Sequence, residues 1–127
     1  MLRILIVDDS ARMRSALRLL INTHAGWQVC GEASNGAEGV SAAAQLKPDV
    51  AVLDFSMPLM NGVEAAAQIR RLVPEAHLLM FTCYADSPIT DAALSAGIET
   101  LVAKDEFTKL LRALQQFELA ERVAPRP

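Results

Sequence analysis

The sequence has few cysteines, few aromatic residues and no long apolar run. Its two cysteines, Cys30 and Cys83, are far apart and lack CxxC or metal-ligand spacing, so we expect two free thiols in a reducing compartment. No apolar run approaches the ~20 residues that cross a bilayer. The N-terminus, MLRILIVDD, turns acidic too early for a signal peptide. We therefore expect a cytoplasmic protein with no membrane association.

Clustered positive charge is also missing. The chain has 12 Lys and Arg against 15 Asp and Glu, a net charge of −3, and no basic patch interleaved with aromatic residues. Nucleic-acid phosphates are bound by clustered Lys and Arg, so we expect no direct nucleic-acid contact from these residues. The 127 residues, 52% of them hydrophobic, can bury a core without a metal or disulfide.

Short apolar runs alternate with segments of helical periodicity. The run LRILIV is typical of a strand buried on both faces, and Ser10 after it is a good helix N-cap. Asn61 and Glu64 have the spacing of a capping box for a later helix. The expected strands cover residues 2–7, 27–33, 49–54, 78–82 and 98–103. The expected helices cover residues 10–24, 37–46, 61–73, 86–96 and 105–122.

Strict alternation of five strands and five helices predicts an α/β fold. We expect a (βα)5 doubly wound parallel sheet with helices on both faces, in three α/β/α layers. For five strands the flavodoxin-like order 2-1-3-4-5 is expected, with the binding crevice at the carboxyl ends of the first and third strands. Residues 1–122 should form one domain, followed by a linker or tail at 123–127.

Charged and hydroxyl side chains end the strands at that crevice. Asp8 and Asp9 follow the first strand, and Asp54 ends the third. Thr82 ends the fourth strand and Lys104 follows the fifth. Two carboxylates ~4 Å apart repel by roughly 4 kcal/mol at an effective dielectric of 20. The three acids must therefore protonate in part, pair with the lysine, or bind a cation.

The carboxylate oxygens suit Mg²⁺, which takes one or two carboxylates together with substrate phosphate. The same negative cluster repels an unescorted phosphate and argues against a flavin mononucleotide site. With a cation bound, Asp54 can form an acyl phosphate. The protein would then mainly position groups and neutralise charge on the three equatorial oxygens, using Mg²⁺, Lys104 and the Thr82 hydroxyl. The sequence thus predicts Asp54 as a phosphoryl acceptor.

Four segments in this order, ILIVDDS, LDFSMPLMNGVE, MFTCYAD and LVAKDE, carry a family resemblance. From its first strand to its last helix the chain resembles the receiver domain of two-component response regulators. The resemblance implies that Asp54 takes a phosphoryl group from the phosphohistidine of a sensor histidine kinase, with Thr82 and Lys104 contacting the group. It also implies that the domain catalyses its own phosphorylation and dephosphorylation without being a conventional enzyme.

The resemblance further implies a ligand set for Mg²⁺. Asp9 and Asp54 would bind the ion directly, Asp8 through water, and the backbone carbonyl of Ser56 would complete the protein ligands. No other cofactor is implied.

Output would follow from movement of Thr82 and of the face formed by helix 86–96, strand 98–103 and helix 105–122. Leu101 stands at a switch position where the family often has an aromatic residue. The segment LLRALQQF, and Lys-Asp in place of a frequent Lys-Pro, resemble the LuxR-type transcriptional subfamily. The implied partners are an output domain with a helix-turn-helix outside these residues, a partner protein, or a second copy bound through that face.

Two alternatives remain open. A degenerate receiver would act only as a binding module. An aspartyl-phosphate phosphatase of the haloacid-dehalogenase type would carry DxD on its first strand, where this chain has an adjacent acidic pair. We also expect His24 and His77 at the surface and Tyr84 as a partly buried core residue, with a position that shields the acyl phosphate from water as the alternative for Tyr84.

Overall fold

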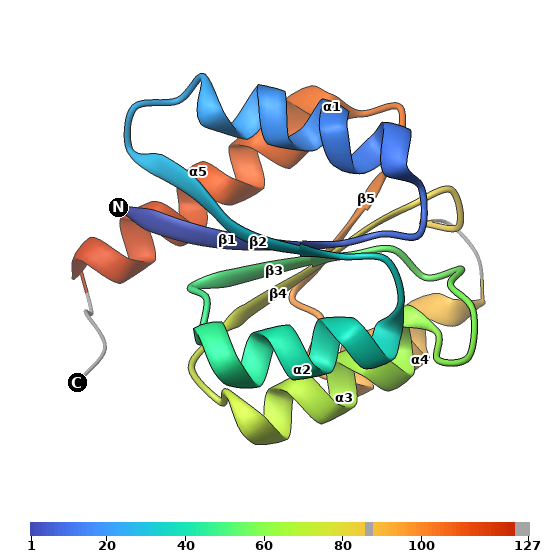
Figure 1. The fold of residues 1–127 in the computed structure, drawn as a ribbon. Coiled ribbons are helices and arrows are strands. Elements are labelled where there is room, and N and C mark those ends of the chain that lie inside the picture. Colours follow the sequence, from blue (N-terminus) through green and yellow to red (C-terminus); the bar gives the residue numbers. More distant parts are fainter. Residues whose placement is uncertain (86–87, 124–127) are drawn as a thin grey trace.

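Five parallel strands form the sheet in the part of the chain that the structure, a computed structural model, describes: residues 1–85 and 88–123. The strand order is β2-β1-β3-β4-β5, so the predicted order is confirmed (Figure 1). The strands are β1 (Leu2–Val7), β2 (Trp27–Ala33), β3 (Val50–Leu53), β4 (His77–Thr82) and β5 (Thr100–Ala103).

Helices cover both faces of this sheet, as predicted. On one face lie α1 (Ala11–Asn22) and α5 (Phe107–Val123) (Figure 1). On the other lie α2 (Gly36–Leu46), α3 (Gly62–Leu72) and α4 (Ile89–Ser95). Among the described helices, none combines the length and apolar character needed to cross a membrane.

The apolar run of β1 is continuous because both of its faces are buried. Ile4 and Ile6 belong to the core cluster that contains Leu17 of α1 and Leu110 of α5. Leu5, between them, belongs to the second cluster, beneath α2 and α3. Successive side chains of a strand point to opposite faces, so a central strand between two helix layers has no polar face.

The main boundary difference is at α4, which begins at Ile89 instead of residue 86. Pro88 is its N-cap residue, and proline suits a helix start because it has no amide hydrogen to leave unbonded. Asp86 and Ser87 lie outside the described residues. The predicted linker at 123–127 also lies outside them, except for Val123, which ends α5.

Side-chain caps fix the loops that leave the carboxyl end of the sheet. Ser10 accepts a hydrogen bond from the Met13 amide at the start of α1. The predicted capping box is confirmed at α3, where Asn61 accepts from the Glu64 amide and Glu64 accepts from the Asn61 amide. Each cap satisfies amides that a helix start leaves unpaired. The two loops therefore have defined conformations beside the crevice.

Candidate functional site

Asp8 and Asp9 leave the end of β1 in different environments. Asp8 is 2% exposed, and Asp9 is exposed. The Asp8 amide donates to the Ala33 carbonyl at 3.0 Å, and the Asp8 carboxylate accepts from the Ser10 amide at 2.9 Å. One acid of the pair is thus fixed within the structure while the other faces solvent.

Asp54 follows the end of β3 and is 6% exposed. Its amide donates to the Val7 carbonyl at 2.9 Å, which continues the pairing of β3 with β1 and brings Asp54 beside Asp8. The loop then returns so closely that a Cβ on Gly62 would lie 2.1 Å from the Asp54 carbonyl oxygen. Glycine is therefore required there by close backbone approach.

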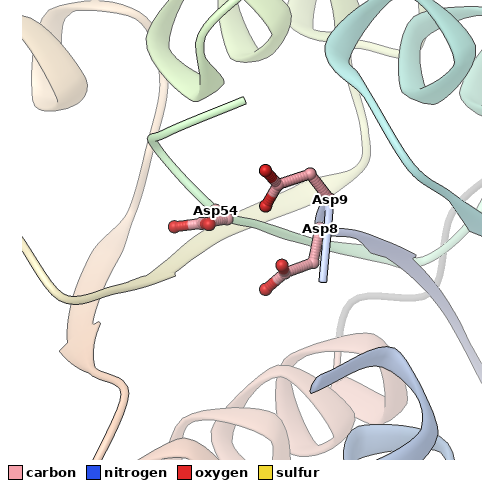
Figure 2. A group of neighbouring side chains, drawn as sticks. All are labelled: Asp8, Asp9 and Asp54. Atoms are coloured by element: carbon pink, nitrogen blue, oxygen red, sulfur yellow. The ribbon is translucent and has the colours of Figure 1, made fainter. Parts of the chain in front are cut away.

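The three acids converge as the strand order predicts. One carboxylate oxygen from each of Asp8, Asp9 and Asp54 lies within 4.8 Å of the others, and Figure 2 shows the three side chains at the ends of their strands.

Lys104 joins the two buried acids. Its Nζ lies 2.9 Å from Asp8 Oδ2 and 3.0 Å from Asp54 Oδ2. The Lys104 amide donates to the Thr82 carbonyl at 3.2 Å, which fixes the end of β5 against β4. Lys104 also lines an open surface hollow with Cys83, so the site is reachable from solvent. Clustered acids are expected to protonate in part, to pair with the lysine or to bind a cation. The structure shows the second of these, because Asp8 and Asp54 both pair with Lys104.

The electrostatics of the site oppose ionisation of Asp54. Burial raises the pKa of Asp54, and the Asp8 charge raises it further, while Lys104 and the Thr82 hydroxyl lower it without cancelling the rise. Burial lowers the pKa of Lys104, but its bonds to Asp8 and Asp54 outweigh burial, so this pKa is raised overall. The single positive charge of Lys104 thus does not fully offset the effect of burial and of Asp8 on the pKa of Asp54.

This donor set fits Mg²⁺. Three hard oxygen ligands lie close together, two of them on buried acids, and a divalent cation would favour the charged form of Asp54. Asp8, Asp9 and Asp54 are the side chains that would hold it.

The other predicted site residues lie at different depths. Thr82 is fully buried at the end of β4, and its Oγ1 accepts from the Tyr84 amide at 3.3 Å. Ser56 is exposed in the loop after Asp54. Leu101 lies inside β5, opposite Met80, and packs against the core cluster beneath α3.

Sequence reasoning missed a cationic support behind Asp8. Nη1 of Arg14 donates to the Asp8 carbonyl oxygen at 2.7 Å, and its Nε lies 3.6 Å from Glu32 Oε1 on β2. Arg14 stands one helical turn after the Ser10 cap, which places it over the loop that carries the acids. That spacing was the available signal.

Fold and site together define a doubly wound α/β domain with a buried aspartate, two further acids and a lysine at its switch point. The model of the family described as "Response regulator receiver domain" matches residues 4–115. The chain therefore belongs to the response regulator receiver domain family.

Individual relatives agree with this assignment. The chain is 39% identical to the chemotaxis protein CheY of Thermotoga maritima, over 80% of this chain and 84% of that protein. It is 32% identical to the response regulator VraR of Staphylococcus aureus, over 85% of this chain but 52% of VraR, so it spans about half of that relative. A solved two-component response regulator of the LuxR family from Aurantimonas is similar with a TM-score of 0.79 and 29% identity, over 95% and 97% of the two chains.

Proposed function

We propose that this receiver domain accepts a phosphoryl group on Asp54 from the phosphohistidine of a sensor histidine kinase. The observation that carries the proposal is the position of Asp54: a buried carboxylate that contacts Lys104 at 3.0 Å and shares a possible cation site with Asp8 and Asp9. A structural role alone would favour one counter-charge for each buried acid, and here Asp8 and Asp54 share the single ammonium of Lys104.

In the proposed transfer, a carboxylate oxygen of Asp54 attacks the phosphorus of phosphohistidine. The new P–O bond forms as the P–N bond breaks, and the leaving imidazole nitrogen takes up one proton. The product is an aspartyl phosphate. Lys104 and the Thr82 hydroxyl would donate to the phosphoryl oxygens, where charge is concentrated in the transition state.

Mg²⁺ is the proposed cofactor, held by Asp8, Asp9 and Asp54, with the Ser56 backbone carbonyl as a further ligand. When bound, it would offset the charge of the acids and of the incoming phosphoryl oxygens. Hydrolysis of the aspartyl phosphate by the same domain would reset it.

The proposed output is a change on the face formed by α4, β5 and α5, started by movement of Thr82, with Leu101 at the position where the family often has an aromatic residue. The resemblance to LuxR-family receivers favours control of transcription through a helix-turn-helix domain outside these residues. A partner protein, or a second copy bound through this face, is the other outcome. We place the protein in the cytoplasm, where such kinases present their phosphohistidine.

Labelling with acetyl phosphate and Mg²⁺, followed by intact-protein mass spectrometry, tests this function. The wild type should gain one phosphoryl group, and Asp54→Ala should gain none. Asp105→Asn, which removes an exposed acid next to Lys104, is the matched control and should label normally. Persistent labelling of Asp54→Ala would sink the assignment. Steady turnover of a small phosphomonoester would instead favour the phosphatase hypothesis.

A further inference from the structure

Two aromatic side chains connect the loops on either side of the phosphoacceptor. The rings of Phe55 and Tyr84 meet edge to face, with centroids 5.8 Å apart and an interplanar angle of 69°. Phe55 directly follows Asp54 and packs against the core cluster beneath α3. Tyr84 stands two residues after Thr82 and is 48% exposed. The contact therefore links the residue next to Asp54 with a ring at the surface.

The backbone of Tyr84 also acts on the Thr82 hydroxyl. The Tyr84 amide donates to Thr82 Oγ1 at 3.3 Å. A hydroxyl has one hydrogen to donate and two lone pairs. With one lone pair occupied by the amide, the hydroxyl keeps its hydrogen to donate, and Thr82 ends β4, the strand that pairs with β3 just before Asp54. The position of Tyr84 thus influences the direction in which this hydroxyl donates.

Leu101 offers no equivalent connection. It lies inside β5, half-buried, and carries no ring whose rotation could change an exposed aromatic surface. Tyr84 is the only tyrosine of the chain. The Tyr84 ring, which is exposed and contacts the residue after Asp54, therefore lies on the β4–α4 side of Asp54, one strand away from Leu101.

We propose that Phe55 and Tyr84 form a positioning pair that orients the Thr82 hydroxyl toward Asp54 and transmits occupancy of Asp54 to the exposed Tyr84 ring. Phosphoryl oxygens on Asp54 are stronger acceptors than the hydroxyl's present partners. Thr82 moves toward them, the amide bonded to its oxygen follows, and the Tyr84 ring shifts against Phe55. This inference rests on the proposed phosphorylation of Asp54.

Fluorine NMR of protein labelled with 3-fluorotyrosine tests the pair, because a single tyrosine gives a single resonance. The phosphoryl mimic beryllofluoride, added with Mg²⁺, contributes its own fluorine signals when it is bound. One spectrum therefore reports both occupancy of Asp54 and the response of Tyr84. We expect the Tyr84 resonance to shift in proportion to bound beryllofluoride, and Mg²⁺ alone to leave it nearly unchanged.

Two matched variants locate the path of the response. Phe55 and Leu101 are both partly buried and pack against the same core cluster, but the ring contact to Tyr84 belongs to Phe55. Phe55→Leu should bind beryllofluoride and lose the Tyr84 shift, and Leu101→Ala should retain both. Thr82→Ala, with the hydroxyl removed, should lose the shift at full beryllofluoride occupancy. Phe55→Met replaces Phe55→Leu if the latter fails to fold.

The possible results separate this inference from the function beneath it. No bound beryllofluoride in the wild type would overturn the proposed function and the inference together. Bound beryllofluoride with an unmoved Tyr84 resonance would overturn the inference alone. A shift that survives Phe55→Leu but disappears in Leu101→Ala would also overturn it, because the response would then run through β5.

Discussion

Charged side chains are arranged differently at the two ends of the sheet. At the carboxyl end, Asp8 and Asp54 lie side by side and share one cation, Lys104. Like charges are thus held together, and the pKa of Asp54 is raised by its burial and by Asp8 despite the lysine.

At the amino end, charges meet opposite charges or backbone donors. His77 Nδ1 lies 3.0 Å from Glu99 Oε1, and Arg70 Nη2 lies 3.9 Å from Glu99 Oε2. Asp49, buried before β3, accepts from the Arg3 amide at 2.8 Å. These bonds tie the starts of the strands together.

This difference separates stability from function within one sheet. At the amino end the paired groups His77 and Glu99 are partly exposed, and buried Asp49 is hydrogen-bonded, which limits the cost of removing these charges from water. At the carboxyl end two buried carboxylates share one ammonium, and under the proposed function the remaining negative charge would bind a cation that then offsets the charge of the phosphoryl group. Substitutions at the two ends should therefore have different consequences.

The largest effect is expected from Lys104→Met, which leaves two buried carboxylates without their ammonium. Removing one partner of a buried pair costs about 3 kcal/mol, so the free energy of unfolding in urea at neutral pH should fall by roughly that amount. The loss should shrink as pH is lowered and the acids protonate. Lys109→Met removes a lysine that is 62% exposed and should change stability by less than about 0.5 kcal/mol. Equal effects of the two variants would contradict the comparison.

A smaller effect on stability, with none on phosphorylation, is expected from Arg70→Met at the amino end. Its guanidinium donates to the carbonyls of Pro74, Ala76 and Gly97, between the end of α3 and the start of β5. Loss of these bonds should lower the unfolding free energy by about 1–2 kcal/mol.

The neighbouring Arg71→Met, on an exposed position, is the control for Arg70→Met and should change little. Acetyl phosphate should label both variants at the wild-type rate. A slower rate in Arg70→Met alone would show that the amino end also serves the reaction.

The smallest effect is a pH dependence at His77. The hydrogen bond to Glu99 raises the pKa of His77 in spite of partial burial, and the Glu121 charge adds to the rise against Arg70. A raised histidine pKa stabilises the fold fully below the unfolded value of about 6.5, and this contribution disappears as pH rises through the folded value. Unfolding free energy should thus decrease by less than about 1 kcal/mol over this window, since Glu99 is partly exposed.

Glu99→Gln should remove most of that pH dependence. His24 is present in both proteins and therefore cancels in the difference. Burial raises the pKa of Glu99, but its bonds to His77 and the Leu78 amide outweigh burial and lower this pKa overall. The lowered pKa of Glu99 affects stability only at acidic pH. A pH profile that is unchanged in Glu99→Gln would assign the effect to another group.

The carboxyl end could be predicted from sequence because each of its residues directly follows a strand. Once the alternation gave a parallel sheet, the positions of Asp8, Asp54 and Lys104 followed from strand order alone. That Lys104 contacts both acids at once could not be predicted, because residue spacing in the sequence does not give distances between side chains.

The amino end and the supports of the site could not be read in this way. His77, expected at the surface, is only partly at the surface, since its side chain is 19% exposed and stacks on Phe117 of α5. The sequence around His77 does not indicate that Phe117, forty residues later in the chain, packs against it. The same is true of Phe55, whose contact with Tyr84 depends on two loops from different strands.

The central claim, that the carboxyl end holds unneutralised charge for a ligand, is tested most directly by urea unfolding of wild type and Asp54→Asn, with and without Mg²⁺. Without Mg²⁺, Asp54→Asn should be the more stable protein, because an acid whose pKa is raised in the fold costs stability when ionised. At a hundredfold excess over its Kd, Mg²⁺ should stabilise the wild type by about 2.7 kcal/mol and Asp54→Asn by much less. Equal stabilisation of both proteins, together with a less stable Asp54→Asn, would contradict the claim.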